Sequence, residues 1–100
     1  MLTENRQFII PGKAGLHVDV TVNPIGELKV NVLEKNNRFT APFEQLVFET
    51  RGKKTELLCK QDPKSETVKW HVSLTSDDAR ELAKLIEVAE DEYEALMRDL

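Results

Sequence analysis

Hydrophobic and polar residues alternate without a break over residues 16–22, 27–32 and 67–74. This two-residue period is typical of β-strands that bury one face. The turn between the first two stretches is short, so these strands are expected to pair as an antiparallel hairpin. In the third stretch the alternation turns Trp70 inward and predicts that it lies in the core. The other inward positions of that stretch are Val68, Val72 and Leu74.

Two shorter stretches also fit strands. Residues 8–10 are apolar and end at a Pro-Gly turn, and residues 55–60 place Leu57 and Cys59 on one inward face. The polar residues 1–7 before them are expected to fray.

The middle of the chain is harder to interpret. Residues 35–38 are expected to form a turn, because two asparagines there tolerate positive φ. The segment 40–52 fits two structures. Phe43 and Val47 have helical spacing, whereas residues 47–50 are typical of a strand that enters a tight turn. The strand is the favoured interpretation.

The last quarter of the chain, residues 75–100, has the strongest pattern. Thr75 is suited to cap a helix, and Asp77 and Asp78 suit the positive end of the helix dipole. Apolar residues then recur at spacings of four and three, which predicts one long helix. They are Leu82, Ile86, Ala89, Tyr93, Leu96 and Leu100.

Together these elements predict a single α+β domain over residues 1–100. We expect an antiparallel sheet of five to six strands, with one face covered by the long C-terminal α-helix. Such a helix measures roughly 36 Å at about 1.5 Å per residue, whereas five strands span only about 24 Å. The helix is therefore expected to overhang its own sheet.

Composition limits the classes of function. The chain has 40% hydrophobic and 32% charged residues, as ordinary folded domains do. It has no apolar run near the roughly 20 residues that span a bilayer, and its first residues lack the features of a signal peptide, so we expect a cytoplasmic protein that does not enter the membrane. The single cysteine, Cys59, cannot form an internal disulfide and is expected to be a buried, reduced thiol.

Catalytic chemistry has few candidates. The chain holds two histidines and one cysteine, without a motif that sets a nucleophile beside a base, so we expect no enzyme and no cofactor. His17 and His71 lie on outward faces of strands. They could share a metal ion if those strands were neighbours, but solvated histidines are the favoured interpretation, and no metal site is expected.

Basic residues gather in the turns, where they could neutralise phosphates. These candidate nucleic-acid contacts are Lys35, Arg38, Arg51, Lys53, Lys54, Lys60 and Lys64. In an up-and-down sheet, successive turns lie at opposite ends. This would separate the turn at residues 51–54 from the turn with Lys35 and Arg38 and from the loop with Lys60 and Lys64. The strand and amphipathic helix over residues 70–86 resemble the end of the transcriptional coactivator domains that bind single-stranded DNA. This resemblance implies single-stranded nucleic-acid binding as an alternative function.

Acidic residues are concentrated on the predicted helix. Residues 76–100 contain nine acidic and three basic residues, a net charge of −6, whereas residues 1–75 have a net charge of +2. The acidic face suits a basic partner surface, although solvated acidic faces are common.

The apolar stripe of the helix continues beyond the width of the sheet, and a stripe left in water promotes association. We therefore expect a homo-oligomer held by Tyr93, Leu96, Met97 and Leu100, in which the acidic helix could meet the basic body of a second copy. The favoured function is a non-enzymatic interaction module that binds a protein partner and itself. Small size without motifs is also typical of phage and plasmid accessory proteins.

Overall fold

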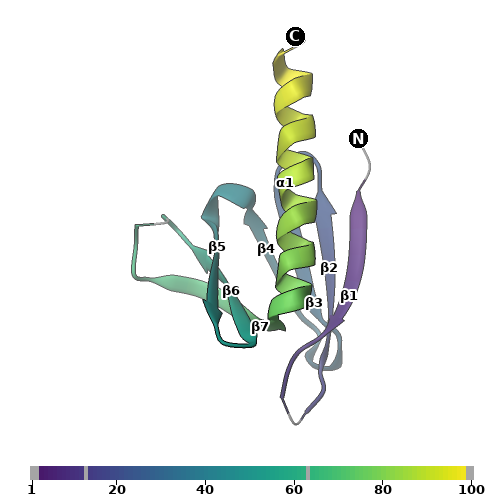
Figure 1. The fold of residues 1–100 in the computed structure, drawn as a ribbon, viewed down its shortest axis with the longest axis vertical. Coiled ribbons are helices and arrows are strands. Elements are labelled where there is room, and N and C mark those ends of the chain that lie inside the picture. Colours follow the sequence, from purple (N-terminus) through teal and green to yellow (C-terminus); the bar gives the residue numbers. More distant parts are fainter. Residues whose placement is uncertain (1–2, 13, 63, 99–100) are drawn as a thin grey trace.

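A computed structural model of the chain describes residues 3–12, 14–62 and 64–98. Figure 1 shows strands gathered beside one long helix whose C-terminal part extends past them. The elements follow in the order β1 (Glu4–Ile9), β2 (His17–Asn23), β3 (Glu27–Val32), the 3-10 helix η1 (Leu33–Lys35), β4 (Asn37–Pro42), the 3-10 helix η2 (Phe43–Gln45), β5 (Leu46–Arg51), β6 (Lys54–Lys60), β7 (Val68–Thr75) and α1 (Ser76–Arg98). Within these residues, no helix is both long and apolar enough to cross a membrane.

The strands form two antiparallel sheets, one of four strands in the order β1-β2-β3-β4 and one of three in the order β5-β6-β7. The α+β class and the antiparallel pairing are confirmed. The single sheet of five to six strands is wrong, because the chain leaves the first sheet after Pro42. Proline lacks the N–H that a strand ladder needs, and the short η2 then redirects the chain into β5.

The N-terminal segment is more ordered than its polarity suggests. Residues 4–7, which were expected to fray, belong to β1 and pair with β2 from Glu4 opposite Val22 onward. Phe8 anchors this strand, since it is buried in the core. Arg6 adds an ion pair of 3.2 Å to Glu81 on α1. The expected fraying is wrong, because polar residues that point outward do not prevent a segment from pairing as the edge strand of a sheet.

The β2–β3 hairpin forms as the alternation predicts. Its register places Val18, Val20 and Val22 opposite Val32, Val30 and Leu28, and all six side chains are buried. A tight turn joins the two strands, in which the amide of Gly26 donates to the carbonyl of Asn23 over 3.0 Å.

The segment 40–52 combines both interpretations. The favoured strand is confirmed as β5, while the helical spacing around Phe43 corresponds to the single turn of η2. The expected turn at 35–38 lies slightly earlier. Asn36 adopts the left-handed conformation with φ 52°, and Arg38 already belongs to β4.

In the second sheet some of the inward positions are buried and others are not. Leu57, Cys59, Val72 and Leu74 lie inside as predicted, but Val68 is 39% exposed. Trp70 is half-buried rather than a core residue. An irregular register at Cys59 and Lys60 marks the place where β7 leaves the regular ladder, so its first residues extend past the covered part of the sheet.

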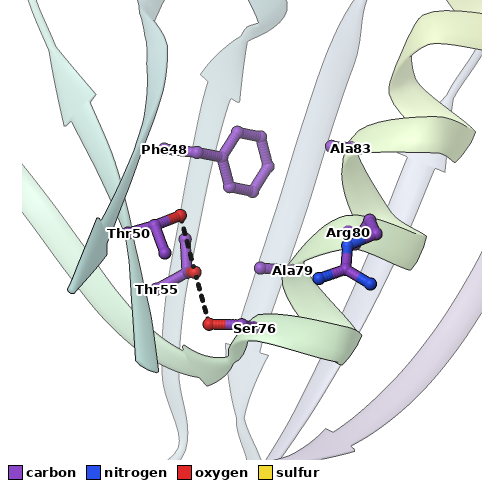
Figure 2. Close-up of a pocket in the computed structure, with 7 residues that line it drawn as sticks. All are labelled: Phe48, Thr50, Thr55, Ser76, Ala79, Arg80 and Ala83. Carbon is purple, nitrogen blue, oxygen red and sulfur yellow. Dashed lines mark hydrogen bonds between the residues drawn. The ribbon is translucent and has the colours of Figure 1, made fainter. Parts of the chain in front are cut away.

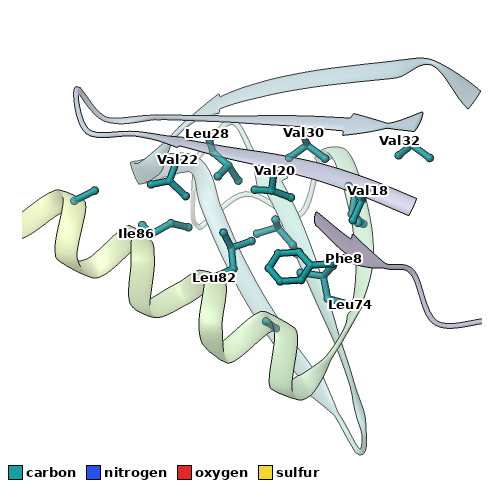
Figure 3. Close-up of a cluster of buried hydrophobic side chains, with 14 residues drawn as sticks. Phe8, Val18, Val20, Val22, Leu28, Val30, Val32, Leu74, Leu82 and Ile86 are labelled. Atoms are coloured by element: carbon teal, nitrogen blue, oxygen red, sulfur yellow. The ribbon is translucent and has the colours of Figure 1, made fainter. Parts of the chain in front are cut away.

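The helix α1 begins at the predicted cap, because the amide of Asp78 donates to Oγ1 of Thr75 over 3.2 Å. Its first half contributes Ala79, Leu82, Ile86 and Ala89 to the same buried cluster as side chains from both sheets (Figure 3). From residue 90 to residue 98 every residue is exposed. The helix thus projects beyond the strands, and the molecule measures 48 × 29 × 25 Å.

Candidate interaction site

The projecting part of α1 carries an exposed apolar stripe. Tyr93, Leu96 and Met97 are 40%, 49% and 50% exposed, and their spacing of three and four residues places them on one face of the helix. We call these three residues the tail seam. The expected fourth member, Leu100, lies outside the described residues. The predicted seam is thus apolar and exposed, and it begins where the core side of the helix ends at Ala89.

A cleft opens where the projecting helix leaves the strands. Its volume is about 530 Å³. The amide of Phe43 donates to the carbonyl of Gly26 over 2.9 Å, so η2 is held against the β2–β3 turn and both face the helix. The cleft is lined by Ile25, Gly26, Pro42, Phe43, Glu44, Glu90, Tyr93 and Glu94. We call it the tail cleft.

The tail cleft combines an apolar floor with acidic edges. Ile25 is 69% exposed at the tip of its turn, although it is a large aliphatic residue. Glu44 stands on η2, while Glu90 and Glu94 stand one turn apart on α1. Glu94 also pairs with Arg98 over 3.5 Å, but both side chains are largely exposed and the pair is weak. The cleft therefore faces solvent with a negative charge.

A second hollow lies beside the first turn of α1 and has a volume of about 210 Å³ (Figure 2). Its polar wall is a chain of hydroxyls, in which Thr55 is bonded to Thr50 over 3.1 Å and to Ser76 over 3.2 Å. Arg80, the one charged residue that lines it, is 79% exposed and pairs with Asp77. Among the described residues that line the hollow, the hydroxyls bond to each other and none bonds to a histidine or a carboxylate.

The two histidines do not meet. His17 lies on β2 in the four-stranded sheet and contacts Glu34, whereas His71 lies on β7 in the three-stranded sheet and contacts Glu56. Across residues 3–12, 14–62 and 64–98, no group of three histidine, cysteine or acidic side chains is placed to hold a metal ion. The alternative of a shared metal site is therefore wrong for the described residues.

Sequence reasoning missed a polar cluster on the outer face of the second sheet. Glu56 accepts a short hydrogen bond from Ser73 and lies 3.2 Å from Nδ1 of His71. In a nucleophilic triad the serine contacts the histidine, but here the carboxylate lies between them. Only the β6–β7 register brings these residues together, so the sequence alone had no signal for them.

The candidate nucleic-acid contacts divide between two ends of the molecule. Arg51, Lys53 and Lys54 surround the β5–β6 turn, which joins the start of α1 through a 2.9 Å hydrogen bond from the amide of Ser76 to the carbonyl of Lys53. The segment that joins β3 to β4 lies at this same lower end in Figure 1, and it contains η1, which ends at Lys35.

The expected separation of residues 51–54 from the turn near Lys35 is wrong. Two strands, β4 and β5, connect these turns, so the chain returns to the same end of the molecule. Arg38 follows at the start of β4, whereas Lys60 and Lys64 belong to the end of β6 and the loop after it. Glu49 pairs with Arg51 over 3.7 Å and with Lys60 over 4.0 Å, which reduces the free positive charge.

Cys59 is a buried free thiol, as expected from the alternation. Burial raises its pKa, and its sulfur lies 3.7 Å from Oε1 of Gln45. A thiol in this environment is a weak nucleophile.

Comparison of the chain with protein-family models, curated proteins and solved structures found no match. The resemblance of residues 70–86 to coactivator domains gains no support from these comparisons.

Proposed function

We propose that the protein is a non-enzymatic interaction module that binds a protein partner and self-associates through the tail seam. The observation that carries this proposal is an apolar helix face left in water. Tyr93, Leu96 and Met97 are about half exposed, on a helix segment where every described residue is exposed. An exposed apolar stripe of this kind marks an interaction surface.

A second copy is the simplest cover for the tail seam. In a twofold contact the same patch buries itself, so no other surface is required. The seam stands on residues 90–98, the exposed end of the 23-residue helix α1, which leaves room for an antiparallel helix from another copy.

Size-exclusion chromatography with light scattering tests this proposal. We expect a mass of about twice 11.4 kDa at high micromolar concentration. Leu96→Glu should return the mass to that of one chain. Val88→Glu is the matched control, because Val88 is equally exposed but lies on another face of α1. A wild-type mass of one chain, or an oligomeric Leu96→Glu variant, would refute self-association through the seam.

Single-stranded nucleic-acid binding is the second candidate. The observation that favours it is that the β3–β4 connection, which contains Lys35, and the β5–β6 turn, which is flanked by Arg51, Lys53 and Lys54, lie at the same end of the molecule. Titration with oligo-dT at low and moderate salt tests it, because binding to phosphates weakens steeply with added salt. Absence of binding at micromolar protein in low salt removes this candidate.

A further inference from the structure

We infer that the tail cleft docks a cationic amphipathic segment of a partner protein. This inference rests on the proposed function as a protein-binding module, and it specifies the chemistry of the partner. The docked segment would insert an apolar side chain between the β2–β3 turn and α1, and would place Lys or Arg side chains against the acidic edges.

The apolar floor supplies the first part of the argument. Ile25 is 69% exposed and Tyr93 is 40% exposed, and Phe43 adds a partly buried side chain to the same lining. The volume of about 530 Å³ is within the range of roughly 300–1,000 Å³ of clefts that bury a ligand. Three separate elements form its walls, so the shape is set by the fold rather than by one mobile side chain.

The charges supply the second part. Glu44 approaches from η2, and Glu90 and Glu94 approach from α1, so carboxylates stand on two sides of the floor. The described residues that line the cleft include no Lys or Arg. A cationic segment thus complements both sides at once.

A second copy fits this cleft less well than a cationic partner does. The tail cleft of a second copy is edged by the same residues, Glu44, Glu90 and Glu94. A contact between the two clefts would therefore bring like charges together. The tail seam shares Tyr93 with the cleft but continues past it to Leu96 and Met97, which leaves apolar surface outside the cleft for self-association.

The probe is a fluorescein-labelled helical peptide of Leu and Lys with all Leu residues on one face. Two control peptides are a scrambled version of the same composition and a version with Glu in place of Lys. We expect fluorescence anisotropy to show binding of the amphipathic cationic peptide about tenfold tighter than of either control. Equal binding of the scrambled peptide would mean non-specific attraction and would overturn the inference.

Variants then locate the site. Ile25→Ser and Glu90→Gln should each weaken binding by about threefold to tenfold, because they remove the floor and one edge of the cleft. Val88→Ser and Glu92→Gln are the controls and should leave binding unchanged. At about 100° per residue, Val88 points roughly 140° away from Tyr93, and Glu92 roughly 160° away from Glu90. Equal losses in the test and control variants would contradict docking in the cleft.

Mass measurements separate this inference from self-association. Ile25 lies outside the tail seam, so Ile25→Ser should weaken peptide binding and keep the wild-type mass. If Ile25→Ser instead falls to the mass of one chain, a second copy occupies the cleft and the inference is wrong. If the wild-type protein has the mass of one chain but binds the peptide through the cleft, self-association fails and the inference stands.

Discussion

At the scale of single residues, Glu34 ties η1 to the start of β2. Its carboxylate accepts the amide hydrogen of His17 over 2.8 and 2.9 Å, and its Oε2 lies 2.8 Å from Nδ1 of the same histidine. The hydrogen bond from the His17 side chain, followed by that from its amide, lowers the pKa of Glu34. The carboxylate of Glu34 thus joins the start of β2 to η1, which directly follows the end of β3.

We predict that Glu34→Gln lowers the melting temperature at pH 7 but has a smaller effect in acid. A carboxyl group whose pKa is lowered by folding stabilises the folded state above its unfolded pKa of about 4.3, and this contribution disappears as the pH falls through the folded pKa. Thermal unfolding of both proteins between pH 7 and pH 3 measures the difference. Glu66→Gln is the control, since no side-chain hydrogen bond or ion pair of Glu66 is present among the described residues. An equal difference at all pH values would contradict the role of ionised Glu34.

Trp70 shows how a single residue departs from its pattern. Its ring stacks on Phe39 with centroids 5.4 Å apart, and its Nε1 donates to the carbonyl of Thr40 over 3.4 Å. Phe39 and Thr40 belong to β4 in the other sheet, so the indole joins the two sheets at their edges. The alternation correctly turned Trp70 inward, but a residue at the edge of a core keeps one side in water.

At the scale of elements, alternation predicted the strands well and their grouping poorly. Residues 16–22 and 27–32 form the hairpin that the pattern indicates, because one buried face imposes a period of two. The same period holds in either sheet, so it does not reveal that the chain changes sheets after Pro42. Only the proline and the short turn of η2 mark that change, and both fit an ordinary loop.

The candidate site could be predicted only where it lies on one element. The tail seam follows from helical spacing, since Tyr93, Leu96 and Met97 share a face of a single helix. The tail cleft instead combines α1 with Ile25 and Phe43, which are distant in sequence from the helix. No local pattern identifies such a contact, because it depends on how the hairpin and η2 are placed against the helix.

The N-cap of α1 gives a prediction for this element. Thr75→Ala should lower the free energy of unfolding by about 1 kcal/mol, because the amide of Asp78 loses its acceptor at the start of a helix whose first half is core. Thr75→Ser keeps the oxygen and should lose much less. Urea denaturation with an unchanged m value measures the effect. Equal destabilisation by both substitutions would mean that the methyl group of Thr75, rather than its hydroxyl, stabilises the helix.

At the scale of the whole molecule, charge is distributed unevenly along the long axis. The projecting end carries Glu90, Asp91, Glu92 and Glu94 with Arg98, while the opposite end holds the basic β5–β6 turn and η1, together with Asp77 and Asp78 in the first turn of α1 (Figure 1). A twofold axis at the tail seam would place the two basic ends at the far ends of the dimer. The acidic helix of one copy would therefore meet the acidic helix of the other, and not the basic body that the sequence suggested.

This arrangement predicts that added salt strengthens self-association. Raising the ionic strength from about 0.01 M to about 1 M shortens the Debye length from roughly 30 Å to roughly 3 Å, which screens the repulsion between the acidic helices. Apolar contact between the seams is not weakened by that screening. Sedimentation or light scattering across this range should show a growing dimer fraction, with Leu96→Glu remaining at 11.4 kDa throughout. A dimer that instead dissociates as salt rises would place the acidic helix against the basic end of its partner, and the twofold axis would then lie away from the tail seam.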